Sequence, residues 1–197
     1  MRRQEFLPFA PSPGTFVIGY VGRLVEQKGL RVLVQAAAGL PGDWRLLLVG
    51  DGPLRGELEQ QASALGIADR LHIAPAVPST EVPRWLNMCD CLVLPSLTRP
   101  NWKEQFGRVL VEAMACQVPV IGSDSGEIPH VIGEAGLVAG EGDADALRQR
   151  LLQLMGDEVL RRRLAELGRR RVLACYTQAR IALATCSFYR SVLAGTG

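Results

Sequence analysis

Residues 16–38 read FVIGYVGRLVEQKGLRVLVQAAA, and they indicate most clearly how the chain is built. An apolar run over Phe16–Gly22 predicts a strand, a polar turn follows, and Leu30–Ala38 has the pattern of a helix. The strand is continuously apolar rather than alternating, which is typical of a parallel strand covered on both faces. The stretch therefore predicts the first strand, turn and helix of a βαβ unit.

The same alternation continues along the chain. Further apolar runs predict strands at Trp44–Gly50, Arg70–Ala76, Cys91–Ser96, Pro119–Ser123 and Ala135–Ala139. Helices are predicted between them at Leu54–Leu65, Thr80–Met88, Phe106–Cys116 and Ala144–Met155, and two more around Glu158–Cys175 and Thr177–Leu193. Because crossovers between parallel strands are right-handed, this order predicts an α/β fold. We expect a doubly wound, six-stranded, mostly parallel Rossmann-like sheet with helices on both faces, plus C-terminal helices.

Size and composition limit the classes of function. A length of 197 residues suits one domain, and 48% of the residues are apolar, enough to bury a core. The formal net charge of +2 gives no support to a nucleic-acid partner, which would favour a strongly basic face. No run approaches the roughly 20 apolar residues of a membrane span, and prolines break the first apolar run, so no signal peptide is expected.

The chain has five cysteines, at positions 89, 91, 116, 175 and 186, mostly within apolar segments. None shows the Cys-x-x-Cys spacing that is common in zinc sites. Reduced, buried, structural thiols in a cytoplasmic protein are therefore favoured over metal or redox chemistry.

Chemistry is expected just after the strands, because ligands of open parallel sheets bind beyond the carboxyl ends. Arg23 and Lys28 flank the turn after the first strand, where Gly22 and Gly29 let the backbone turn sharply. An arginine fork and a lysine point charge suit phosphate oxygens. The alternative is an ordinary solvated loop with two surface charges.

Residues 104–115 read EQFGRVLVEAMA and follow the fourth strand. The helix predicted from Phe106 is apolar almost all round and should be buried, so a carboxylate at Glu112 needs a partner, such as a ribose diol. Eight helical rises put Glu104 about 12 Å from Glu112, which suits contact with both ends of a sugar nucleotide. The open N–H groups of Gln105, Phe106 and Gly107 would face a phosphate at the positive helix end. The alternative is that Glu104 caps the helix and Glu112 pairs with Arg23 or Lys28.

Residues 119–129 read PVIGSDSGEIP, a strand running into a small, flexible turn. This turn is interpreted as a loop over the ligand crevice, although a plain turn without a ligand explains it equally well.

Together these segments resemble the C-terminal, donor-binding domain of family-four retaining glycosyltransferases, which have the GT-B fold. The similarity covers Phe16 to Leu193 and rests on four motifs: Gly22-Arg23 with Lys28-Gly29, Gly50-Asp51-Gly52-Pro53, Glu104 to Glu112 with Ala113-Met114-Ala115, and Ser123 to Ile132. Two positions depart from the family pattern, because Gln117 replaces a common glycine and His130 replaces a common glutamate.

The resemblance implies roles for individual residues. Arg23 and Lys28 would hold the donor diphosphate, and with Glu104, which would contact donor-sugar hydroxyls, they form the implied catalytic group. Glu112 would bind the ribose. The donor-binding group also includes Gly22, Gln105, Phe106 and Gly107, with the base resting near Ala76, Val77 and Pro78. The resemblance further implies a UDP-, GDP- or ADP-linked sugar as donor, a hexosyl group as the transferred unit, and neither metal nor cofactor.

The resemblance also predicts how the chain is divided. Residues 1–14, which are punctuated by prolines, would be a linker remnant, and residues 15–176 the nucleotide-sugar-binding domain. Residues 177–197 would form a helix that crosses back to an acceptor-binding domain preceding residue 1. Without that N-terminal domain, we expect weak transfer or none.

A non-catalytic α/β nucleotide-binding or assembly module stays open, whereas a dinucleotide oxidoreductase is disfavoured because the first turn lacks Gly-x-Gly-x-x-Gly. The arginine runs Arg161–Arg163 and Arg169–Arg171 could attract anionic lipid at the inner face of a membrane. A solvated helix face is the preferred explanation of these runs.

Overall fold

The computed structural model describes residues 14–195 and contains one parallel sheet of six strands in the order β3-β2-β1-β4-β5-β6. The strands are β1 (Phe16–Val21), β2 (Trp44–Val49), β3 (Leu71–Ala74), β4 (Cys91–Leu94), β5 (Val120–Ser123) and β6 (Gly136–Ala139). The predicted six-stranded Rossmann-like sheet is confirmed, and every strand pair is parallel. The strand order reverses between β1 and β4, and a sheet of this kind opens its ligand crevice at such a switch point.

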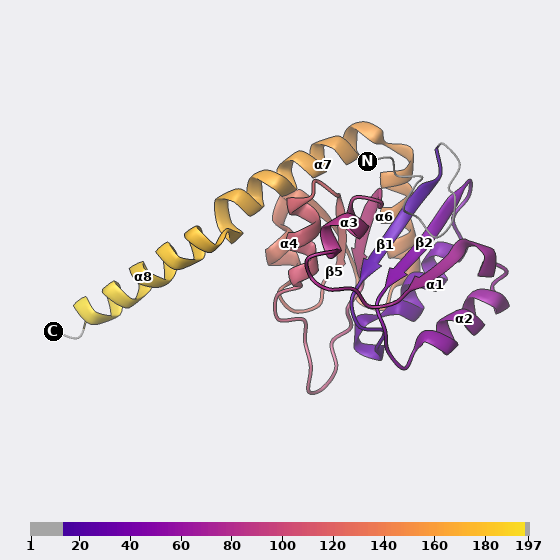
Figure 1. Ribbon diagram of the computed structural model, residues 1–197, viewed down its shortest axis with the longest axis horizontal. Coiled ribbons are helices and arrows are strands. Elements are labelled where there is room, and N and C mark those ends of the chain that lie inside the picture. The colour runs from indigo at the N-terminus through magenta and orange to yellow at the C-terminus, as the bar shows by residue number, and fades with distance from the viewer. Residues whose placement is uncertain (1–13, 196–197) are drawn as a thin grey trace.

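Helices cover both faces of this sheet, and Figure 1 shows the last of them extending away from the body. They are α1 (Leu30–Ala38), α2 (Arg55–Ala64), α3 (Val82–Leu86), α4 (Arg108–Ala115), α5 (Ile128–Ile132), α6 (Ala144–Gly156), α7 (Glu158–Arg171) and α8 (Gln178–Ala194). A π-helical turn, Val172–Tyr176, joins α7 to α8.

Side chains of the central strands alternate between two apolar layers. On β1, Ile18 and Tyr20 belong to the larger core, whereas Val17 packs in a second cluster with Leu47 of β2. Both layers are sealed from solvent, since these side chains are fully buried. This explains why the strands are continuously apolar in sequence: successive residues face opposite layers and neither layer meets water.

Two helix predictions need correction. The segment after β5 was expected to be a flexible loop, but it contains α5, whose Ile128, Val131 and Ile132 are buried. Pro129 lies in the first turn of α5, a position that tolerates its missing N–H. The helix predicted from Phe106 begins instead at Arg108, because Gly107 adopts a left-handed conformation (φ 71°) at the N-cap.

Three arginines of α7 bind the carboxyl ends of other helices. Arg161 donates to the carbonyl oxygens of Leu154 and Met155 on α6. Arg169 donates to that of Ala115 on α4, at 2.5 Å. Arg171 donates to those of His130 and Val131 on α5, at 2.5 and 2.8 Å. Cations at these positions satisfy orphan carbonyls and the negative helix ends.

The arginine runs therefore do not form a uniformly solvated face. That prediction holds for Arg162 and Arg170, which pair with Glu158 and Glu166 on the exposed side of the same helix. It is wrong for Arg161 and Arg171, which are half-buried and bind neighbouring helices. Arg169 is exposed as predicted, although it also donates to a carbonyl group of α4. A helix pattern in sequence cannot show which carbonyl groups of other elements lie within reach.

The cysteines are all free, but they are not all buried. Cys91 is buried, Cys89 and Cys116 are half-buried, and Cys175 and Cys186 are exposed. Burial raises the pKa values of the Cys91 and Cys116 thiols. Within residues 14–195, no cluster of three or more His, Cys, Asp or Glu side chains could hold a metal ion. In the same range, every helix is too short or too polar to cross a membrane.

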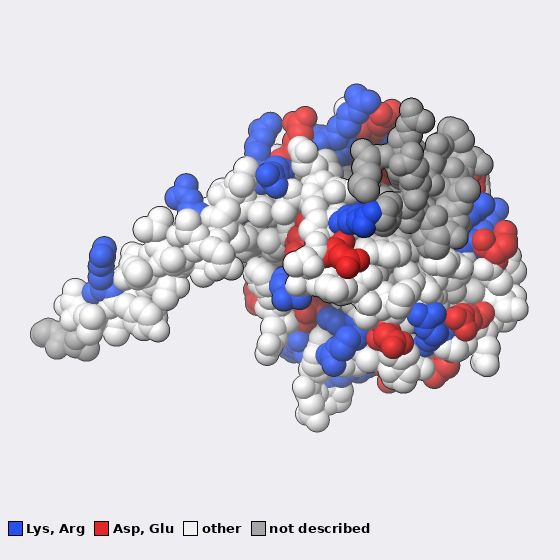
Figure 2. All heavy atoms as spheres, viewed as in Figure 1, with Lys and Arg blue, Asp and Glu red and all other residues white. Residues whose placement is uncertain are grey.

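Helix α8 leaves its apolar side chains in solvent. Phe188, Tyr189 and Leu193 are 64%, 62% and 76% exposed, and no residue of the helix is buried. Figure 2 shows its surface as largely uncharged. The prediction that these three side chains would be unusually exposed is confirmed.

Candidate functional site

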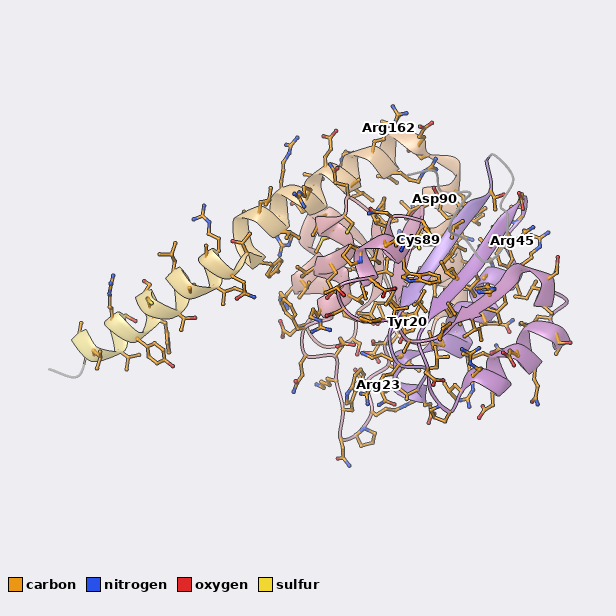
Figure 3. All side chains as sticks on the ribbon, viewed as in Figure 1. Tyr20, Arg23, Arg45, Cys89, Asp90 and Arg162 are labelled. Carbon is orange, nitrogen blue, oxygen red and sulfur yellow. The ribbon has the colours of Figure 1, made fainter. Side chains whose placement is uncertain are left out.

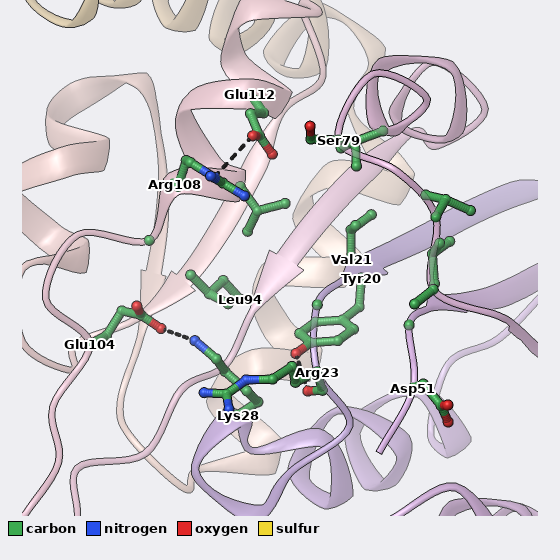
Figure 4. Close-up of a pocket in the computed structure, with 18 residues that line it drawn as sticks. Tyr20, Val21, Arg23, Lys28, Asp51, Ser79, Leu94, Glu104, Arg108 and Glu112 are labelled. Atoms are coloured by element: carbon green, nitrogen blue, oxygen red, sulfur yellow. Dashed lines mark hydrogen bonds and ion pairs between the residues drawn. The ribbon is translucent and has the colours of Figure 1, made fainter.

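A cleft of 560 Å³ opens where the strand order reverses, at the carboxyl ends of β1, β2 and β4 (Figure 4). The cleft is lined by the turn after β1, by residues 49–51, by residues between 76 and 82, and by residues between 104 and 112. Most of the predicted site residues line it: Gly22, Arg23, Lys28, Ala76, Val77, Glu104, Gly107 and Glu112. Gln105 and Phe106 do not.

The turn that carries Arg23 and Lys28 is fixed against the loop after β4. Residues Glu26–Lys28 form a single 3₁₀ turn, and Gly29 ends it with φ 66°. A Cβ atom added to Gly29 would lie 1.9 Å from the carbonyl oxygen of Pro95. Only glycine therefore allows the two segments to approach so closely, and Lys28 is held at the cleft as a result.

Lys28 pairs with Glu104. The Lys28 Nζ and Glu104 Oε2 atoms are 2.5 Å apart, and the Ser96 hydroxyl donates to the same carboxylate at 2.9 Å. The two charged side chains are only 16% and 11% exposed. Charges that are so little exposed need a partner, and each of these two side chains supplies one for the other.

This geometry overturns the alternative explanation of the two carboxylates. Glu104 does not cap α4, because its carboxylate accepts from Lys28 and Ser96 instead of from the first N–H groups of that helix. Glu112 pairs with neither Arg23 nor Lys28 but with Arg108, at 3.2 Å. Figure 4 shows the Lys28–Glu104 pair and the Arg108–Glu112 pair at separate places in the cleft.

The turn after β5 fixes the backbone of Glu104. The Glu127 N–H donates to the Glu104 carbonyl oxygen at 2.9 Å. Gly126 (φ 54°) packs so closely that an added Cβ would lie 2.1 Å from that oxygen. Of the two explanations left open for residues 119–129, the plain turn fits better, because none of them is among the residues lining the 560 Å³ cleft. Their role is to position Glu104 from behind.

Glu112 has an unusual electrostatic environment. Burial raises the pKa of its carboxyl group, and the neighbouring Arg108 guanidinium opposes that shift only in part. Its side chain is 30% exposed, whereas that of Arg108 is 78% exposed. An incoming ligand could therefore take over the Glu112 carboxylate while Arg108 moves into solvent.

The N-terminal end of α4 lies two residues later in the chain than predicted, at Arg108 instead of Phe106. Because α4 begins at Arg108, the amides of its first turn belong to Arg108 and Val109, and both residues line the cleft. The first amides of a helix have no partner within the helix and attract anions. Phe106 instead packs edge-on against Tyr176, with ring centroids 5.6 Å apart. Gln105 lines an adjacent cavity.

Tyr20 is a part of the site that the sequence analysis missed. It is fully buried at the end of β1, and its hydroxyl donates to the Arg23 carbonyl oxygen at 2.8 Å. Burial, with a smaller effect of the Glu104 charge, raises the pKa of Tyr20 above its ordinary value, so it remains a donor. A tyrosine, the one residue with a polar side-chain group in this strand, was the available signal.

Fold and cleft together define a Rossmann-like domain with a charged, ligand-sized cleft at its switch point. Residues 2–171 match the family "Glycosyl transferases group 1", and the chain belongs to that family. It is 33% identical over 152 residues to the 2-deoxystreptamine glucosyltransferase of Streptomyces kanamyceticus, a match that covers 75% of this chain and 38% of that protein.

Two solved structures place the chain within a larger architecture. One is the C-terminal domain of a group 1 glycosyltransferase, LpcC, from Francisella tularensis (29% identity, TM-score 0.74, 84% of this chain and 88% of that one). The other is Anabaena HepE in complex with UDP (26% identity, TM-score 0.81, 90% of this chain and 49% of that one). The chain spans less than half the length of the curated relatives it matches first. The resemblance to the C-terminal domain of a GT-B glycosyltransferase is confirmed.

Proposed function

We propose that the cleft binds the nucleoside diphosphate of a sugar nucleotide, and that the whole enzyme transfers its hexosyl group to an acceptor. One observation carries this proposal: Arg23, Lys28 and the open first turn of α4 line the same cleft. Two cations and a positive helix end are the groups that two linked phosphates require. The HepE structure, which contains UDP, supports the same ligand class.

The lining residues suggest an order for the bound donor. Arg23 and Lys28 bind the diphosphate, while the half-buried Glu112 accepts hydroxyl groups of the ribose. The base lies against the segment of Ala76 and Val77 at the other side of the cleft. Glu104, next to Lys28, is placed to accept hydroxyls of the hexosyl group.

The same groups would promote the chemical step. As the bond between sugar and diphosphate breaks, negative charge develops on the departing phosphate oxygen. Arg23, Lys28 and the α4 helix end stabilise that charge, and their positions are fixed before the reaction begins. This arrangement needs no divalent ion or other cofactor, and we propose that the transfer proceeds without one and retains the anomeric configuration.

Acceptor binding is assigned to an N-terminal domain outside this chain. The longer relatives support that assignment, as do the exposed apolar side chains of α8, which could cover a neighbouring domain. The chain by itself should therefore bind donor and transfer poorly. We propose a cytoplasmic location, where sugar nucleotides are available.

The proposal is tested by thermal shift with UDP, GDP and ADP and with UDP-glucose, GDP-mannose and ADP-glucose. A ligand at a hundred times its Kd stabilises the folded state by about 2.7 kcal/mol, so at least one compound should raise the Tm. The parent nucleosides should act far more weakly because they lack the diphosphate. If none of the six compounds raises the Tm, the chain is better described as a non-catalytic assembly module.

Binding should also depend on pH through Glu112. The two ribose hydroxyls donate to the two oxygens of the ionised carboxylate. Protonation turns one of these acceptors into a donor and removes the charge, so it weakens binding. Because burial raises the pKa of Glu112, this loss should begin at a higher pH than for an ordinary glutamate. We expect about a tenfold loss of affinity as the carboxylate is protonated.

The measurement is the Kd of the tightest nucleoside diphosphate between about pH 7.5 and about pH 4.5. Glu112→Gln provides the matched comparison, since ligand phosphates titrate equally in both proteins. The ratio of the two Kd values should approach one at low pH. A ratio independent of pH would remove Glu112 from ribose binding.

A further inference from the structure

A second cavity, of 330 Å³, adjoins the cleft and shares Arg23, Lys28 and Glu104 with it. The rest of its lining comes from Asn101, Trp102, Lys103 and Gln105. We call it the Trp102 cavity. Its volume falls within the range of about 300–1,000 Å³ that is typical of small-molecule sites.

The chemistry of the lining suits a hydroxyl-rich ligand. Trp102 supplies the aromatic surface of the cavity, and every other lining side chain is charged or carries an amide. A hexosyl ring presents hydroxyl groups around its rim and C–H groups on its faces, so it needs polar partners and an apolar surface together. An indole provides such a surface at low cost in conformational entropy.

The loop that carries Trp102 is fixed at several points. Arg99 and Trp102 exchange two backbone hydrogen bonds, of 2.8 and 3.0 Å. Arg99 also pairs at 2.9 Å with Glu26, which lies in the turn after β1. At its base, the Thr98 hydroxyl donates to Glu141 at 2.5 Å. The loop backbone that carries the Trp102 ring is therefore positioned before any ligand arrives.

Lys28 links the two cavities. Its Nζ atom pairs with Glu104 and lies 5.0 Å from the centroid of the Trp102 ring. A diphosphate bound by Arg23 and Lys28 in the cleft would consequently end at the entrance of the Trp102 cavity. The group bonded to the terminal phosphate would therefore lie in contact with Glu104 and Trp102.

We infer that the Trp102 cavity receives the hexosyl group of the donor and that Trp102 determines how tightly this group is held. The inference rests on the proposed function, because it takes the diphosphate to lie on Arg23 and Lys28. It adds a specificity-determining residue outside the four motifs by which the chain resembles its family. Asn101, exposed on the same loop, contributes a hydrogen bond to a sugar hydroxyl.

The test compares each diphosphate with its sugar nucleotide by calorimetry on the full 197-residue chain. The probes are UDP with UDP-glucose, GDP with GDP-mannose and ADP with ADP-glucose, and the pair that binds most tightly is used. Trp102→Ala should weaken the sugar nucleotide about five- to tenfold and change the diphosphate by no more than about twofold. Trp102→Phe, which keeps an aromatic face, should recover most of that loss, and Asn101→Ala should show a smaller loss with the same selectivity.

Phe188→Ala is the matched control, because it removes an aromatic ring that is 64% exposed on α8, away from both cavities. It should leave both Kd values unchanged. Equal losses for diphosphate and sugar nucleotide in Trp102→Ala and Asn101→Ala, or no loss in either, would overturn the inference and leave the proposed function standing. If the unaltered chain binds none of the six probes, the proposed function fails and the inference fails with it.

Discussion

Replacing Lys28 with alanine is expected to weaken a nucleoside diphosphate about a hundredfold while leaving the bare nucleoside nearly unaffected. The substitution removes a cation from the phosphate site, and it also leaves the Glu104 carboxylate buried without its partner at 2.5 Å. The unpaired negative charge then repels the diphosphate. Truncating one member of a buried charge pair typically costs about 2–5 kcal/mol, which corresponds to losses of this size.

Calorimetry with a diphosphate and its nucleoside measures how much of the lost affinity depends on the phosphates. A double variant then separates the loss of the Lys28 cation from the effect of the unpaired Glu104 charge. Adding Glu104→Gln to Lys28→Ala removes the stranded charge, so the double variant should bind the diphosphate more tightly than Lys28→Ala alone. Arg45→Ala is the control, because Arg45 pairs with Asp43 at 2.9 Å and lies near the opposite end of the sheet from Arg23 (Figure 3). Equal losses for nucleoside and diphosphate would contradict a phosphate role for Lys28.

The pairing of Lys28 with Glu104 marks the limit of what the sequence could predict. Both residues were identified individually, since each follows a strand where ligands bind. Their contact depends on how residues 96–104 return to the turn after β1, and irregular segments have no periodicity from which to infer a path. The same reason explains why Trp102 was not identified, although it stands two residues before Glu104.

Strand positions were predictable for a different reason. The inner strands β1, β2, β4 and β5 are buried on both faces along nearly their whole length, so their sequences are almost continuously apolar. The edge strands β3 and β6 are largely half-buried, yet they are still mostly apolar. Helix boundaries were less secure because they depend on single backbone conformations. Gly107 adopts φ 71° and starts α4 at Arg108, which moves Phe106 out of the site. A glycine in sequence does not reveal whether its left-handed conformation is used.

The roles of polar side chains were the least predictable feature. Three arginines of α7 look like surface charges in sequence, yet they bind carbonyl groups at the ends of α4, α5 and α6. The turn at Gly126 similarly looked like part of a ligand loop, and it supports the Glu104 backbone instead. In each case the partner is a backbone group of another element, whose position follows only from the complete fold.

Close backbone packing around the site leads to the second large effect. Gly29→Ala should destabilise the fold by about 3 kcal/mol, whereas Gly66→Ala should cost only about 1 kcal/mol. Both glycines have left-handed backbones, with φ 66° and 71°, so an alanine suffers similar conformational strain at each. They differ in surroundings: an added Cβ at Gly29 would lie 1.9 Å from the Pro95 carbonyl oxygen, but at Gly66 it would meet nothing within 4 Å.

Urea denaturation of the two variants measures this difference directly, as a shift in the midpoint at an unchanged slope. The site should respond as well. Relieving the clash at Gly29 must move the turn that carries Lys28 away from the loop after β4, so Gly29→Ala should also weaken the diphosphate, while Gly66→Ala should not. Equal destabilisation by both variants would mean that backbone strain alone sets the cost. The close contact with Pro95 would then not be what holds Lys28 at the cleft.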